Sequence, residues 1–127
     1  MTRYLSEAQL TARLNLGKAV GQFLSRQDLT DYAVIKWLTI YKGGEEKEYS
    51  LYYNEVIDEG PENFLDLVEL TPVDPDDYPV IEEFNSVEEV LVFAARKYGT
   101  SLHKYVTDSM VNDEYADYLR GIGIIGK

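Results

Sequence analysis

The chain has 127 residues and a net charge of −11, which predicts one acidic domain over residues 1–127 that nucleic acid and anionic membrane surfaces repel. It contains no cysteine, which excludes thiol catalysis and iron–sulfur clusters and favours the reducing cytoplasm. No stretch approaches the ~20 apolar residues of a membrane helix, and Arg13, Lys18 and Gln22 interrupt the region where a signal peptide needs an apolar run.

The first predicted element is a helix from about Ser6 to Leu24. Ser6 and Gln9 have the spacing of a capping box, and apolar residues or glycines then recur every three or four positions. Gly17 and Gly21 weaken such a helix by about 1 kcal/mol each, but they also allow another element to approach closely. We interpret them as a contact with a sheet; a break near Gly17 is the alternative.

Two β-strands are predicted next, at residues 32–41 and 48–57, because both segments are rich in β-branched and aromatic residues. The first is apolar on both faces, which indicates a central strand. Two glycines between them can adopt the positive φ of a hairpin. Residues 64–71 predict a third strand and residues 80–84 a short edge strand. We therefore expect an antiparallel meander of three to four strands.

Two helices are predicted in the C-terminal part. Ser86 and Glu89 have capping-box spacing, and an amphipathic segment follows them and ends before Gly99, so the first helix covers residues 87–98. The second covers residues 108–119. The expected fold class is therefore α+β: an N-terminal helix, the meander, and two C-terminal helices packed on one face of the sheet.

Three motifs lack the context that their chemistry needs. Residues 121–126 match G-x-G-x-x-G, but a dinucleotide site requires a strand before this loop and a helix after it. Residues 74–77 hold three aspartates without the ligand spacing of a calcium loop. His103 is the only histidine, and no nucleophile motif accompanies it. The sequence therefore predicts no catalytic residues, no metal site and no cofactor.

The acidic residues are concentrated in the middle of the chain. Residues 45–89 carry a charge of −15 with Lys47 as their only base, whereas the rest of the chain carries +4. Such a block can be a solvated face that aids solubility, or a docking face for a cationic protein. The second reading predicts a basic protein partner.

Tyrosine is the second unusual feature, because the chain has eleven and three of them lie in residues 48–57. Aromatic pairs stabilise a sheet, but tyrosine is also enriched at interface cores. We therefore predict a non-enzymatic, inhibitor-like or immunity-like module that docks a basic partner through an acidic, tyrosine-rich sheet face. The predicted contact residues are Tyr49, Tyr52, Tyr53, Glu55, Asp58 and Glu59.

Two alternatives stay open. One is a small-molecule-binding regulatory domain with a pocket between sheet and helices, lined by Trp37, Tyr41 and Tyr53. The other is a homo-oligomeric structural subunit in which the basic ends of one chain contact the acidic block of the next. An enzyme is not favoured, because no acid, base and nucleophile constellation stands out.

Overall fold

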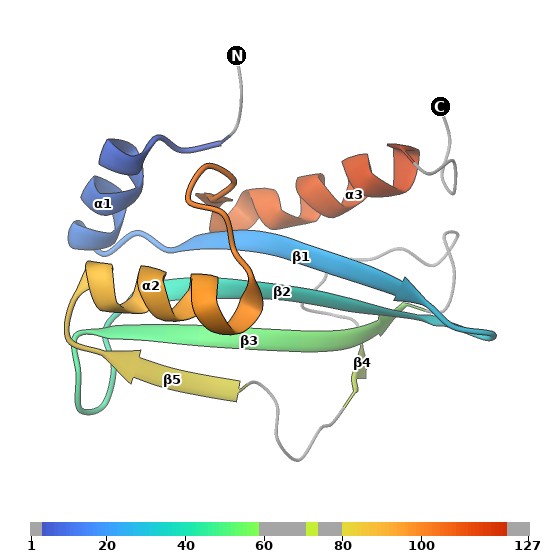
Figure 1. The fold of residues 1–127 in the computed structure, drawn as a ribbon, viewed down its shortest axis with the longest axis horizontal. Helices are drawn as coiled ribbons and strands as arrows, with labels where there is room; N and C mark the ends of the chain where they lie inside the picture. Colours follow the sequence, from blue (N-terminus) through green and yellow to red (C-terminus); the bar gives the residue numbers. More distant parts are fainter. Residues whose placement is uncertain (1–3, 59–70, 74–79, 122–127) are drawn as a thin grey trace.

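The computed structural model describes residues 4–58, 71–73 and 80–121, and it has the predicted α+β class (Figure 1). Its elements in chain order are α1 (Glu7–Asn15), β1 (Val20–Asp28), β2 (Ala33–Lys42), β3 (Tyr49–Asp58), β4 (Thr71–Pro72), β5 (Val80–Phe84), α2 (Val87–Tyr98), β6 (Val106–Thr107), a 3-10 turn (Asp108–Met110) and α3 (Val111–Gly121).

The strands form one antiparallel sheet in the order β4-β3-β2-β1-β6, and β5 also pairs with β3. The predicted hairpin is confirmed, because β2 and β3 pair along their whole length from Ala33 opposite Asp58 to Lys42 opposite Tyr49. The predicted central strand is β2, which has β3 on one side and β1 on the other. The sheet has more strands than the expected three to four, since β1 and β6 were not anticipated.

The predicted first helix is too long. The helix α1 ends at Asn15, and Gly17 has a φ of 82°, a left-handed conformation that stops a helix and suits glycine. Residues 20–28 instead form β1, which pairs with the apolar strand β2. This long-range pairing outweighs the local helical spacing, and the alternative of a break near Gly17 is the one that the structure shows.

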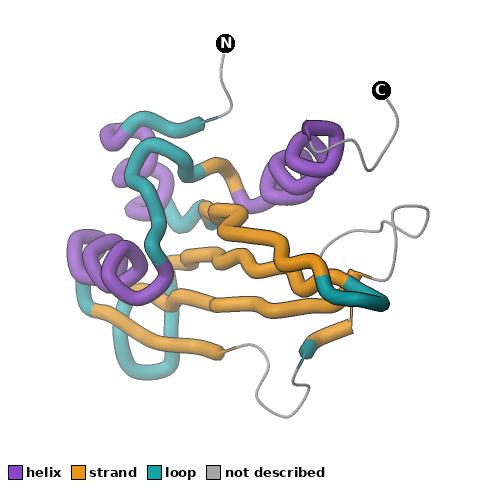
Figure 2. Tube along the Cα trace, turned by 45° about the vertical axis from the view of Figure 1, so that its right-hand side comes forward, coloured by secondary structure: helices purple, strands orange, loops and turns teal. Residues whose placement is uncertain are grey.

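The helices lie on opposite faces of the sheet, which differs from the expectation that α2 and α3 share one face (Figure 2). On one face, α1 and α2 pack against Leu38, Ile40 and Leu51. On the other face, α3 packs against Ile35 and Trp37. The chain passes from one face to the other because β6, which lies between α2 and α3, pairs at the edge of β1. Both apolar faces of β2 are thereby covered.

Local signals set the limits of α2 as predicted. The Ser86 hydroxyl accepts a hydrogen bond of 3.1 Å from the backbone amide of Glu89, and Gly99 ends the helix with a φ of 72°. The predicted strand at residues 64–71, apart from its last residue, lies outside the described residues, as do residues 74–77 and the glycine motif from residue 122 onward.

Candidate functional site

Five glutamates define what we call the acidic end of the molecule. Three lie in the connection between β2 and β3, and two lie in the first turn of α2: Glu45, Glu46, Glu48, Glu88 and Glu89. All five are exposed. The connection and the start of α2 lie at the same end of the sheet (Figure 1), because β5 runs alongside β3 and delivers the chain into α2 there.

Glu83 holds the β2–β3 connection in place from the neighbouring strand β5. Its carboxylate accepts hydrogen bonds from the backbone amides of Glu46 at 2.9 Å, Lys47 at 2.9 Å and Glu45 at 3.2 Å. These backbone bonds lower the pKa of Glu83 below its ordinary value. One carboxylate therefore fixes the backbone from which the side chains of Glu45 and Glu46 project.

The acidic end has no ion pair among the described residues. The ion pairs in the described part of the chain lie elsewhere: Arg26 with Asp28 at 3.1 Å, and Lys97 with Glu82 at 3.7 Å. Lys42, the last residue of β2, directs its ammonium group to the carbonyl oxygen of Asn15 at 3.0 Å. Lys47 is the one base within the connection and is exposed, so among the described residues the acidic end keeps an excess of negative charge that faces solvent.

The predicted contact residues do not form one surface. Tyr49 is buried, and its hydroxyl donates to the side chain of Asn15 at 2.9 Å. Tyr52 lies on the α3 face, where its ring contacts Tyr41 at 5.0 Å between centroids. Asp58 is also buried, and Glu59 lies outside the described residues. Consecutive strand residues point to opposite faces, so this set could not share one face.

Tyr53 and Glu55 are the two predicted contact residues that the structure brings together. The Tyr53 hydroxyl donates a hydrogen bond of 2.6 Å to the Glu55 carboxylate, and its ring stacks on Tyr98 of α2 at 4.3 Å. Burial, followed by the bond to Glu55, raises the pKa of Tyr53. Both side chains are partly exposed, so a binding role for them stays a prediction.

The pocket predicted from Trp37, Tyr41 and Tyr53 is not assembled. Trp37 is buried beneath α3, and Tyr41 lies on that same face of β2. Tyr53 lies on the opposite face, against α2. The sheet itself separates Tyr53 from Trp37 and Tyr41.

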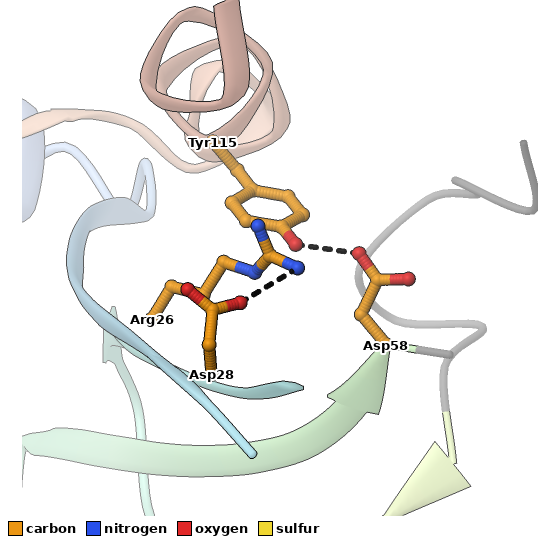
Figure 3. A network of polar contacts seen from close by, with 4 residues as sticks. All are labelled: Arg26, Asp28, Asp58 and Tyr115. Carbon is orange, nitrogen blue, oxygen red and sulfur yellow. Dashed lines mark hydrogen bonds and ion pairs between the residues drawn. The ribbon is translucent and has the colours of Figure 1, made fainter. Parts of the chain in front are cut away.

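Asp58 belongs to a buried polar network on the α3 face (Figure 3). It accepts a hydrogen bond of 2.5 Å from the hydroxyl of Tyr115, whose pKa is raised by burial and by this bond. Next to them Arg26 is 93% buried and pairs with Asp28 through Nη2, while Nε and Nη1 have no hydrogen-bond partner within the described residues. Because its residues come from β1, β3 and α3, we expect this network to stabilise the packing of α3 on the sheet.

The second surface feature is an apolar groove of about 410 Å³ between α1 and α2. Its apolar walls comprise Leu10, Val87, Leu91, Val92, Ala95 and Leu102. Two acids, Glu7 and Glu88, also line it. One feature of the sequence points to this groove: Val92 is apolar but does not lie on the face of α2 that packs against the sheet. The position of α1 beside α2 depends on β1, which was not predicted.

Two features are absent from the described residues. No helix there is both long and apolar enough to cross a membrane. No group of three or more histidine, aspartate or glutamate side chains there is arranged to hold a metal ion. His103 is exposed, and its backbone amide donates to the hydroxyl of Ser101 at 3.3 Å.

Comparison of this chain with protein-family models, with curated proteins and with solved structures finds no significant match.

Proposed function

We propose that this protein is a non-enzymatic binding module, inhibitor-like or immunity-like, that docks a basic protein through its acidic end. The observation that carries the proposal is the set of five exposed glutamates that have no ion pair among the described residues. Because the chain as a whole carries −11, the rest of the molecule adds to this field.

A surface with an excess of charge of one sign affects how a protein meets its partner. It attracts a partner of the opposite sign before contact and orients it, which speeds association more than it strengthens the final complex. Salt screens this attraction over about 10 Å at 0.1 M, so association through exposed carboxylates falls steeply as salt is added. Glu83 supports this use, because it fixes the β2–β3 backbone before a partner arrives.

The test separates the acidic end from net charge. The chain is immobilised, exposed to native lysate at low salt and eluted at high salt, and the eluted proteins are identified. One variant is Glu45→Lys/Glu46→Lys. The matched control is Asp31→Lys/Asp113→Lys, which makes the same change in charge at exposed positions away from the acidic end.

We expect the wild type and the control to capture the same basic proteins and the acidic-end variant to lose them. Association of a captured partner, measured at low salt, should be roughly tenfold or more slower for the acidic-end variant. Capture that resists salt, or equal losses in both variants, would contradict docking through the acidic end.

A further inference from the structure

The groove between α1 and α2 leaves apolar side chains uncovered. Val92 is 44% exposed and Leu102 is 38% exposed, and both lie in its walls. Leu10, beneath them, is fully buried and joins the groove to the core of this face of the sheet. An apolar side chain from another molecule could therefore be inserted here and lose contact with water on several sides.

The charged side chains that line the groove are both acids. Glu7 lies in the first turn of α1, and Glu88 lies in the first turn of α2. The helix dipoles favour negative charge at these positions. Glu88 also belongs to the acidic end, which makes the groove and the acidic end one continuous surface.

We infer that this groove binds one face of a basic amphipathic helix from the partner. This inference rests on the proposed function, since it names the element of the basic partner that makes contact. Apolar residues of that helix fill the groove, and its lysine or arginine side chains lie beside Glu7 and Glu88. The charge of the groove lining thus selects for a cationic helix.

The walls of the groove favour a helix over an extended strand. Both long walls are α-helices, whose backbone groups are already paired within each helix, so no free sheet edge is offered for strand addition. Contact must come from side chains, and a helix presents apolar residues on one face at intervals of three and four. A second copy of this chain is disfavoured, because two acidic surfaces would face each other.

The probe is a synthetic helical peptide with leucines at intervals of three and four residues and lysines at most other positions. Its binding to the full chain is measured by fluorescence anisotropy. The key variant is Ala95→Arg, which places a cation and extra volume in the groove. The matched control is Ala8→Arg, an exposed position of α1 that does not line the groove and changes the charge equally.

We expect Ala95→Arg to weaken peptide binding roughly tenfold or more through crowding and like-charge repulsion, while Ala8→Arg stays within about twofold of the wild type. A scrambled peptide of the same composition should bind more weakly, because it cannot place its leucines on one face. Circular dichroism of both variants checks that the fold is kept.

Three results would overturn the inference. They are equal binding of the two arginine variants, equal binding of the scrambled peptide, and preference of the groove for an uncharged apolar dye over the peptide. In each case salt-dependent capture that requires Glu45 and Glu46 could still succeed, which would leave the proposed function standing. The converse result is also possible: the peptide binds, Ala95→Arg abolishes this binding, and no protein is captured from the lysate. That result would support the groove and contradict docking at the acidic end.

Discussion

At the scale of single residues, the carboxylate of Asp58 lies inside the protein. Asp58, the last residue of β3, is 1% exposed and accepts a hydrogen bond from Tyr115 of α3. A buried charge is costly unless hydrogen bonds satisfy it, so this bond offsets part of the cost of burying Asp58. Asp58 therefore stabilises the fold and is not part of an exposed docking surface, although the sequence predicted it as a contact residue.

The substitution Tyr115→Phe tests this role. It removes the donor hydroxyl while keeping the ring that packs on Phe23 at 5.6 Å. We expect the free energy of unfolding to fall by about 1–3 kcal/mol, because a buried carboxylate loses a hydrogen-bond donor. Urea unfolding of the wild type and the variant measures the difference.

The control is Tyr118→Phe in the same helix, since Tyr118 also packs on Phe23 but is 36% exposed. It should change stability by less than about 0.5 kcal/mol, as surface substitutions usually do. If the two variants were equally stable, the bond to Asp58 would not have the role that we assign to it.

At the scale of elements, Gly21 sets how closely α3 approaches the sheet. A Cβ atom at this position would lie 2.6 Å from Cγ2 of Val111, the first residue of α3, and 3.0 Å from the carbonyl oxygen of Leu38 in β2. The close approach that the sequence attributed to this glycine is therefore present, but between β1 and α3. The glycine belongs to a strand and not to a helix.

We expect Gly21→Ala to lower the free energy of unfolding by about 1–3 kcal/mol, because α3 or β2 must move to admit the methyl group. Gly121→Ala serves as the control, since a Cβ atom there meets nothing within 4 Å. Thermal unfolding of the two variants compares them. A Gly21→Ala protein as stable as the control would show that α3 can shift at little cost.

The elements also show what local sequence can predict. The helix α2 and the β2–β3 hairpin follow from signals within a few residues: the Ser86 cap, Gly99, and two apolar segments around a glycine turn. The strand β1 does not, because its spacing of apolar residues and glycines suits a helix until β2 is present to pair with it. Because β1 was not predicted, the position of α1 beside α2 could not be predicted either, nor could the groove between the two helices.

At the scale of the whole molecule, the acidic block of the sequence becomes a smaller acidic end. Glu82 pairs with Lys97, Glu83 binds backbone amides, and Asp58 is buried, so these acids of the block are used internally. The concentration of charge was readable from the sequence. Which carboxylates remain unpaired depends on side-chain contacts that form only in the fold.

Tyrosines on both faces of the sheet make the whole molecule sensitive to alkaline pH. Burial raises the pKa of Tyr105 from 10.0 to about 12, and burial is also the largest cause of the raised pKa values of Tyr53, Tyr98 and Tyr115. Below pH 10 these side chains are neutral in both states, so they do not make stability depend on pH. Above pH 10 these tyrosines ionise more readily in the unfolded chain than in the folded protein, so rising pH favours the unfolded state.

The free energy of unfolding should therefore fall as pH rises from 10 towards 12, and the buried Tyr105 alone should contribute about 1.4 kcal/mol per pH unit to this fall. Tyr105→Phe removes one of these contributions, so its stability should fall less steeply over this interval, whatever its stability at neutral pH. Urea unfolding at several pH values gives the slopes of the wild type and of Tyr105→Phe. Equal slopes would show that Tyr105 ionises as readily in the fold as in the unfolded chain.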